Sequence, residues 1–322
     1  MCVMENRFFM YEESINVSLD RITISGSIVR HKTDITELKE YLKNSNWEYI
    51  SDTEFRLVRI NENDVAEHVA GLYKNPFQNS SWRLDTSNHL KNNSVYNELS
   101  EIQNVVSFMQ NPKISRLDLA FDYINMDIDS PSMAHDIYRF NSSKTIYSKK
   151  QLEDLTHYVV FKSRSQKIQT IYSGKRTSGF MIRYYDKIAE QRSRRKEIPD
   201  NVKKWERLEL QLGSAEKTGN WFEHTKEMLN YFKKPVYSDM KPTERAMFFA
   251  LQEGVVSYSD LSKETRARYR KLIKNNSGFD DTYARLAYEE LLKRKNDILD
   301  EINAFVKKLD TEVIIKKYDA NI

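Results

Sequence analysis

Hydrophobic and polar residues alternate over several short stretches in the first two thirds of the chain, a period typical of β-strands with one buried face. Helical spacing of hydrophobic residues separates some of them, at 34–42, 94–109 and 187–196. The predicted strands span 16–29, 47–60 with a break at 51–53, 80–86, 116–122, 156–161, 168–172, 180–185 and 205–212. This mixture predicts an α+β fold with an antiparallel or mixed sheet and flanking helices.

The pattern changes near Gly213, where the alternation of period two stops and helical spacing begins. The predicted helices beyond this point span 216–232, 243–251, 259–274 and 281–309. We therefore predict two regions: an α+β domain over residues 1–215 and a mainly helical region over residues 216–322.

Three of the predicted strands carry charged or hydroxyl side chains on one face, opposite hydrophobic residues. These side chains are Arg116, Asp118 and Asp122 on the first strand, Arg183 and Tyr185 on the second, and Arg207 and Glu209 on the third. If the strands pair in one sheet, a single surface holds carboxylates, arginines and a tyrosine above an apolar core. These are the groups that metal-assisted phosphoryl transfer to a tyrosine hydroxyl requires.

The order and spacing of these motifs resemble the Rep_trans family, the replication initiators of small rolling-circle plasmids and related nickases of integrative elements. The resemblance rests on Arg-Leu-Asp-Leu-Ala-Phe-Asp at 116–122, Ile-Arg-x-Tyr-x-Lys at 182–187 and Arg-x-Glu at 207–209. Flanking pieces at 19–26 and 171–174 also fit, so the resemblance extends over residues 17–305. Each fragment alone is a weak signal, and their combination is specific.

The resemblance implies that Tyr185 attacks a DNA phosphodiester and forms a 5′-phosphotyrosyl link. A tyrosine hydroxyl, with a pKa of about 10, needs a base or a metal to become a good nucleophile. Tyr184 is the alternative, because Tyr184-x-x-Lys187 also fits a Tyr-x-x-Lys pattern, but alternation places it on the face opposite Arg183. The family usually has a second basic residue where Ile188 stands, so Lys187 and Arg183 are the expected phosphate contacts beside the tyrosine.

Three acids are the expected ligands of a Mg²⁺ or Mn²⁺ ion, because these cations prefer oxygen donors: Asp118, Glu209 and Asp122. The alternative is that these acids pair with Arg116 and Arg207, which are also candidates for binding phosphate. The family often has a second acid where Gln211 stands. None of the 6 histidines lies in the His-hydrophobic-His pair that other endonuclease-type initiators use.

Composition narrows the class of protein. Cys2 is the single cysteine, which excludes an intramolecular disulfide and a cysteine-based zinc site and fits a reducing cytoplasm. No apolar run approaches the roughly 20 residues that span a bilayer. Met1–Ser14 lacks the basic start and apolar run of a signal peptide. We therefore expect a cytoplasmic protein with no membrane partner.

The net charge is +4, and the arrangement of the charges tells more than their sum. One face of the predicted helix at 259–274 carries five basic residues, namely Lys263, Arg266, Arg270, Lys271 and Lys274. A basic face is usually just solvated, but the resemblance assigns this region to recognition of the origin duplex, with contacts to phosphates. The apolar stripe of 281–309 either packs on the body of the protein or forms the homodimer contact that the family uses.

The predicted function is initiation of rolling-circle replication, with nicking by the α+β domain and origin recognition, and possible dimerisation, by the helical region. The expected partners are double-stranded origin DNA, the nicked single strand, a second copy of the chain, and a host helicase and polymerase. One alternative is a relaxase or nickase of an integrative or conjugative element, which uses the same chemistry. The other is a non-enzymatic, sequence-specific DNA-binding protein, which would form no covalent adduct.

Overall fold

The computed structural model of the chain describes residues 12–28, 32–60, 66–76, 80–86, 96–128, 158–162, 168–174, 179–229, 234–235, 241–252, 255–275 and 279–309. The helices are α1 (Lys32–Lys43), α2 (Tyr96–Ser107), α5 (Lys187–Ser193), α6 (Ala215–Gly219), α7 (Trp221–Leu229), α8 (Pro242–Gln252), the 3₁₀ turn η2 (Tyr258–Asp260), α9 (Lys263–Asn275) and α10 (Thr282–Lys308). The strands are β1 (Ser14–Ser27), β2 (Trp47–Ser51), β3 (Glu54–Ile60), β4 (Ala66–Lys74), β5 (Ser81–Thr86), β6 (Gln110–Ile124), β7 (Tyr158–Lys162), β8 (Ile168–Ser173), β9 (Phe180–Asp186), β10 (Trp205–Leu212), β11 (Lys234–Pro235) and β12 (Phe279–Asp280).

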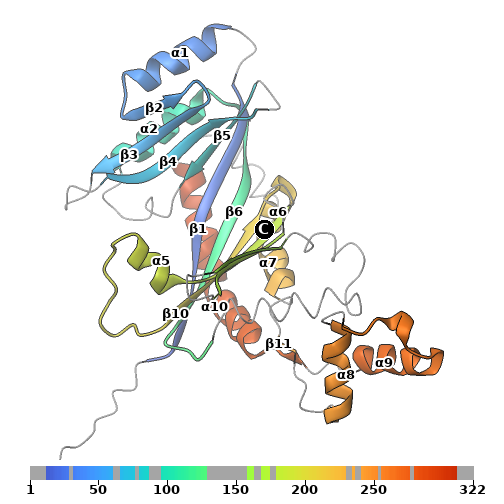
Figure 1. The fold of residues 1–322 in the computed structure, drawn as a ribbon. Helices are drawn as coiled ribbons and strands as arrows, with labels where there is room; N and C mark the ends of the chain where they lie inside the picture. Colours follow the sequence, from blue (N-terminus) through green and yellow to red (C-terminus); the bar gives the residue numbers. More distant parts are fainter. Residues whose placement is uncertain are drawn as a thin grey trace, which may run out of the picture. The chain divides into compact units, whose positions relative to one another are not determined.

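Ten strands hydrogen-bond in the order β2-β3-β4-β5-β1-β6-β10-β9-β8-β7, and β11 pairs with β12 (Figure 1). The helices α6 to α10 all follow the last strand of the large sheet. The predicted α+β fold, with an antiparallel sheet and a mainly helical C-terminal region, is therefore confirmed.

Residue contacts divide the chain into two compact units that interleave in sequence, and each is described by itself. The first unit contains Met1–Val17, Ala120–Glu209 and Glu227–Leu291. The second contains Ser18–Leu119, Leu210–Lys226 and Leu292–Ile322. The predicted regions 1–215 and 216–322 followed from the change of hydrophobic pattern near Gly213, and their boundary stays a prediction.

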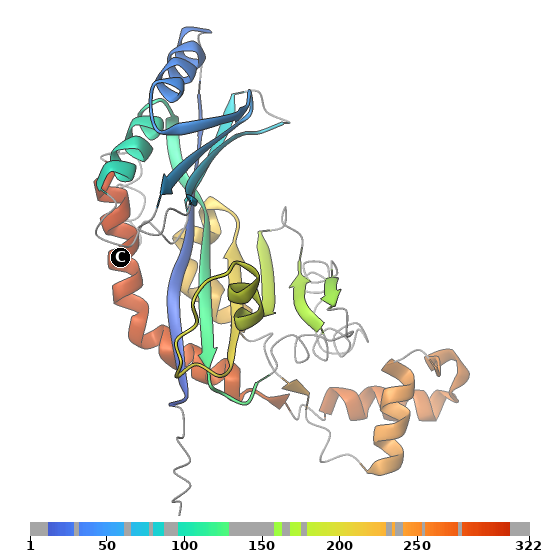
Figure 2. The same cartoon turned by 60° about the vertical axis from the view of Figure 1, so that its left-hand side comes forward.

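The second unit contains the antiparallel strands β2 to β5, with β5 pairing with β1 (Figure 2). Trp82 and Phe55 are each 1% exposed and their rings lie 6.5 Å apart in the core beside these strands. β4 was not among the predicted strands, because Gly71 interrupts its hydrophobic pattern. The Tyr73 ring lies over Gly71, so close that a Cβ there would meet the Tyr73 hydroxyl at 2.4 Å. The aromatic side chain compensates for the missing one in the strand.

The first unit contains the predicted antiparallel meander of β7, β8 and β9, which the strand pairing confirms. β8 and β9 pair with Thr170 opposite Tyr185 and Tyr172 opposite Arg183. α5 begins at once after β9, and the Asp186 side chain caps it by accepting a hydrogen bond from the Ala189 N–H at 2.9 Å. The cap fixes the direction in which the chain leaves β9.

Asn125 ties the end of β6 to the segment that leads into β10. Its φ of 55° lies in the left-handed region, which asparagine tolerates better than most residues. The Asn125 Oδ1 accepts hydrogen bonds from the N–H groups of Lys203 and Lys204, at 2.8 and 3.3 Å. Its Nδ2 donates to the Asn201 carbonyl at 2.9 Å, and its own N–H donates to the Lys204 carbonyl at 2.8 Å. One side chain therefore joins two strands that carry predicted site residues.

α10 bears the apolar stripe for which the sequence left packing and dimer contact open. Five of its members are 9% exposed or less within the single chain: Leu291, Ile298, Ile302, Phe305 and Leu309. This burial agrees with the packing alternative, and the homodimer stays a prediction.

Within the described part of the chain, no helix combines the length and apolar character needed to cross a bilayer.

We predict that Asn125→Ala lowers the free energy of unfolding by about 3 kcal/mol, because it loses the side-chain hydrogen bonds and strains the left-handed backbone. Asn125→Gly loses the same hydrogen bonds without the strain, so we expect a smaller loss, about 1–2 kcal/mol. Urea unfolding measures both. Equal stability of the two variants would contradict a role for the backbone conformation. An unchanged free energy of unfolding in both variants would contradict a stabilising role for the Asn125 hydrogen bonds.

Candidate active site

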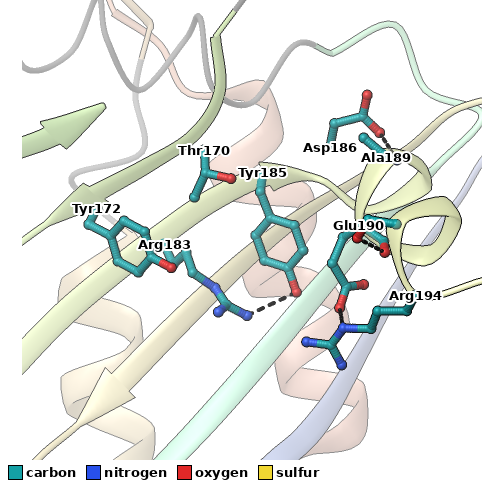
Figure 3. A pocket seen from close by; sticks show the side chains of 9 residues that line it. Thr170, Tyr172, Arg183, Tyr185, Asp186, Ala189, Glu190 and Arg194 are labelled. Atoms are coloured by element: carbon teal, nitrogen blue, oxygen red, sulfur yellow. Dashed lines mark hydrogen bonds and ion pairs between the residues drawn. The ribbon is translucent and has the colours of Figure 1, made fainter. Parts of the chain in front are cut away.

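Four side chains form a patch on one face of β8 and β9, because residues two apart in a strand share a face and cross-strand partners lie side by side. They are Thr170, Tyr172, Arg183 and Tyr185. Figure 3 shows Tyr185 beside Arg183, with Tyr172 and Thr170 next to them on the neighbouring strand. The guanidinium carbon of Arg183 lies 4.5 Å from the centre of the Tyr185 ring, which is a cation–π contact.

The Tyr185 hydroxyl lies at the centre of a hydrogen-bond network. It donates to Glu209 Oε1 at 2.5 Å and accepts from an Arg183 Nη at 3.1 Å. The same Arg183 nitrogen also donates to Glu209 Oε1 at 2.5 Å, and Arg207 lies 3.9 Å from that oxygen. Three predicted site residues from two strands thus meet at one hydroxyl group.

The protonation states in this network are set by burial and charge. Burial, and next the charge of Glu209, raise the pKa of Tyr185 well above its ordinary value of 10.0. Burial alone would also raise the pKa of Glu209, but the charge of Arg183 and the hydrogen bond from Tyr185 reverse this and lower it from 4.5. At neutral pH the tyrosine is therefore neutral, and an ionised carboxylate already accepts its proton in a hydrogen bond.

Asp122 and Arg207 form a second buried pair in the first unit. Arg207 donates to both Asp122 oxygens at 2.6 Å, a bidentate pair, and the Trp205 indole N–H donates to Asp122 Oδ1 at 2.6 Å. The Arg207 side chain is 9% exposed. Because Arg207 also lies near Glu209, it connects Asp122 and Glu209, the two predicted metal ligands that belong to the first unit.

Lys187 stands at the start of α5 and is 8% exposed. Burial, followed by the charge of Arg207, lowers its pKa from 10.5. Its ammonium group pairs with Glu190 at 2.8 Å and lies 5.6 Å from the centre of the Tyr185 ring. Glu190 also pairs with Arg194 at 2.6 Å, so one acid holds two cations at the edge of the site.

Tyr184 points away from this network, as strand alternation predicted. It is 3% exposed and pairs across the sheet with Ile171. It also lies near the fully buried Tyr123, whose pKa is raised first by burial and next by Tyr184. Tyr184 therefore belongs to the core face of β9, opposite the face that carries Arg183 and Tyr185.

The three predicted metal ligands are each held by an arginine. Asp118, in the second unit, accepts from Arg116 Nε at 2.7 Å and Nη at 2.5 Å, while Asp122 and Glu209 have the partners given above. Within the described ranges, no group of three His, Cys, Asp or Glu side chains is placed to hold a metal ion. In this arrangement the residues do not fit a preformed Mg²⁺ or Mn²⁺ site, and metal binding stays a prediction.

A pocket of about 280 Å³ opens beside Tyr185 (Figure 3). Seven of its lining residues were not among the predicted site residues: Thr170, Tyr172, Asp186, Ala189, Glu190, Ser193 and Arg194. Trp205, which holds Asp122, was also not predicted. The signal for the two β8 residues was their strand position, because the register with β9 places them beside Arg183 and Tyr185.

The predicted DNA-binding residues lie on α9, in the first unit. Lys263, Arg270 and Lys271 are exposed, whereas Lys274 has a side chain outside the described residues. Arg266 is half-buried and donates to the carbonyls of Ser259 and Leu261, at 3.5 and 3.1 Å.

Contacts of two α9 arginines with neighbouring elements add to this picture. The guanidinium of Arg270 lies 5.4 Å from the centre of the Tyr258 ring, and Arg268 pairs with Glu244 of α8 at 2.8 Å. Arg266 and Arg268 therefore hold η2 and α8 against α9. The exposed cations of the predicted set are Lys263, Arg270 and Lys271.

We predict that Glu209→Gln lowers the free energy of unfolding by about 3 kcal/mol at pH 7, because it leaves Arg183 and Arg207 without a buried counter-charge. The folded-state pKa of Glu209 is below its ordinary value of 4.5, so the acid stabilises the fold above that pH. The difference between wild type and variant should shrink as the pH falls through the lowered pKa.

Urea unfolding between pH 3 and pH 7 checks this. The exposed Glu216 of α6 supplies the control, and Glu216→Gln should change stability by less than about 0.5 kcal/mol. A loss in Glu209→Gln that stays constant across this pH range would contradict an ionised Glu209 in the folded state.

Comparison with known proteins identifies a family that shares these sequence features. Residues 112–278 match the Rep_trans family, whose description is replication initiation factor. A replication initiation protein of Staphylococcus aureus is 24% identical over 283 residues, which cover 86% of this chain and 81% of that protein. Another from the same species is 28% identical over 181 residues, 56% of this chain and 51% of that protein.

Among solved structures, a rolling circle replication initiator protein from Geobacillus stearothermophilus aligns with a TM-score of 0.40 and 13% identity. The alignment covers 71% of this chain and 90% of that one. The family match alone spans more than half of the chain and includes every active-site residue described above. The chain belongs to the Rep_trans family of replication initiation factors.

Proposed function

We propose that this chain initiates rolling-circle replication by nicking one strand of its origin with Tyr185 and rejoining that strand at termination. The observation that carries the proposal is the position of the Tyr185 hydroxyl, which donates to the ionised Glu209 while Arg183 donates to it. A nucleophile bonded to a base that further groups orient is the arrangement that covalent catalysis requires.

The proposed step forms a bond between the Tyr185 oxygen and phosphorus and breaks the bond from phosphorus to the 3′ oxygen. Glu209 takes the proton of Tyr185 as the attack proceeds, because the raised pKa of Tyr185 opposes its ionisation beforehand. The 3′ oxygen takes a proton from water and leaves as a hydroxyl, and the protonated Glu209 gives its proton to the hydroxide that remains. The phosphotyrosyl ester retains the free energy of the original bond, so attack by a 3′ hydroxyl reverses the step and rejoins the strand.

Two cations serve the phosphate in this proposal. Arg183 already faces the Tyr185 hydroxyl, so it can hydrogen-bond a phosphate oxygen placed there and stabilise the charge that develops. Lys187 adds a second positive charge near the Tyr185 ring. Arg207 remains paired with Asp122 and does not contact the phosphate in this proposal. Its charge, together with the larger effect of Arg183, keeps the pKa of Glu209 low.

The exposed cations of α9 support a second part of the proposal, contact with the phosphates of the origin duplex. Each phosphate contact releases counterions, so binding that depends on such contacts weakens as the salt concentration rises. The guanidinium of Arg270 lies against the Tyr258 ring, and this contact holds its side chain in place.

The central test uses supercoiled plasmid that carries the DNA upstream of and within the gene, incubated with Mg²⁺ or Mn²⁺. We expect wild type to form a nicked circle and a protein–DNA adduct that survives SDS. Tyr185→Phe should lose the adduct completely, because it lacks the nucleophilic oxygen. Tyr184→Phe is the matched control and should keep the adduct, since Tyr184 lies on the core face.

An adduct that disappears only in Tyr184→Phe would overturn the assignment of the nucleophile. Specific DNA binding without any adduct would favour a non-enzymatic DNA-binding protein. EDTA in a parallel reaction tests the metal: if the metal prediction is correct, the adduct is lost and Mn²⁺ or Mg²⁺ restores it. An adduct formed in EDTA would mean that the arginines suffice.

We predict that Lys271→Ala weakens binding to origin and to unrelated duplexes by a similar factor. It should also reduce the slope of log affinity against log salt concentration by roughly 0.9, the change expected for one phosphate contact. Lys43→Ala, which removes an exposed lysine from α1, is the control and should leave the slope unchanged. Fluorescence anisotropy over a salt series measures both, and equal slopes for Lys271→Ala and wild type would contradict the contact.

A further inference from the structure

The pocket beside Tyr185 contains side chains that the proposed chemistry leaves unused. Thr170 and Tyr172 line it from β8, and Glu190 and Arg194 line it from α5 and its C-terminal end. Figure 3 shows Tyr185 between these two sides. A ligand in this pocket would therefore lie directly next to the attacking hydroxyl.

The size of the pocket limits what it can hold. Its volume is about 280 Å³, at the lower end of the roughly 300–1,000 Å³ typical of small-molecule sites. That space suits one nucleoside and excludes a stacked pair of bases or a duplex. In a DNA strand bound for attack by Tyr185, the group within reach is a nucleotide adjoining the attacked phosphate.

The charge of the pocket distinguishes a base from a second phosphate. Its charged lining residues are two arginines and two acids, and Glu190 binds Arg194 at 2.6 Å. Arg183, the other arginine, faces the Tyr185 hydroxyl and serves the attacked phosphate in the proposed step. With its charges balanced, the pocket offers little attraction to a second anion, whereas its donors and acceptors suit a neutral polar ring.

We propose that this pocket holds one unstacked nucleobase of the attacked strand, and that it selects a base with an exocyclic amino group. The inference rests on the proposed nicking function and names the part of its substrate that the site recognises. Tyr172 supplies an aromatic surface for stacking, the usual way in which proteins hold single-stranded bases. Glu190 supplies the acceptor that selects the base.

Glu190 is suited to this selection because it is ionised and fixed in place. Although burial alone would raise its pKa, the hydrogen bond and the charge of Lys187 lower it below 4.5. Lys187 and Gln191 bind Oε2, and Arg194 binds Oε1. A carboxylate has about four lone-pair sites, so it can still accept a hydrogen bond from an amino group. Adenine, cytosine and guanine have such a group and thymine does not.

The test is an abasic scan by fluorescence anisotropy in the Tyr185→Phe background, where no adduct can form. A single-stranded oligonucleotide is taken from the DNA that the protein binds specifically, and each position in turn is made abasic. We expect one position at which the loss of the base weakens binding about tenfold, the size of one stacking contact. Thymine at that position should weaken binding several-fold.

Variants of the pocket then show whether the sensitive base lies there. Tyr172→Phe should keep the sensitivity of that position, because the ring remains. Tyr172→Ala should abolish it, and Glu190→Gln should remove the discrimination against thymine. Arg194, which has a side chain 61% exposed, gives a second route should Tyr172→Ala unfold. Arg194→Ala removes the partner of Glu190 Oε1 and leaves Lys187 and Gln191 on Oε2, so it should change the thymine effect.

Two results would overturn the inference: a scan without any sensitive position, or a sensitive position that responds equally in Tyr172→Phe and Tyr172→Ala. The scan covers the whole oligonucleotide and needs no cleavage, so its outcome is separate from that of the adduct assay. If the scan finds a sensitive position but wild type forms no adduct, the base pocket is supported and the nicking function is contradicted.

Discussion

A single carboxylate oxygen, Glu209 Oε1, organises the candidate active site. It receives the Tyr185 hydroxyl and an Arg183 nitrogen, and Arg207 lies within ion-pair distance. Removing a charge from water costs several kcal/mol, so this buried acid is tolerated only because charged partners surround it. The pairing that keeps Glu209 ionised also aligns Tyr185, so the stability of the site and its proposed chemistry depend on the same contact.

Much of this arrangement could be predicted from the sequence, because period-two alternation determines which side chains share a strand face. The alternation placed Tyr185 with Arg183 and Tyr184 on the opposite face, and the register between β8 and β9 agrees. The predicted pairing of acids with arginines, left open beside metal binding, is the arrangement that the structure shows. The last strand of the meander was predicted to within one residue of its observed end.

Other features depend on contacts between segments far apart in the sequence, which no local pattern reveals. β4 pairs with β3 and β5 despite its weak pattern, and the Tyr73 ring covers Gly71 within it. Trp205 enters the site only because β10 brings its indole to Asp122. On α9, helical spacing put Arg266 with the other cations, but the η2 turn offers carbonyls that take its guanidinium away from solvent.

The cap at the junction of β9 and α5 makes these two elements mechanically continuous. Asp186 fixes the turn, and within one helical turn the chain delivers Lys187 and Glu190 to the edge of the site. Because no loop separates β9 from α5, the position of Tyr185 on the strand also determines where Lys187 and Glu190 lie. A single turn of backbone therefore sets the distance between the tyrosine hydroxyl and the charges at the edge of the pocket.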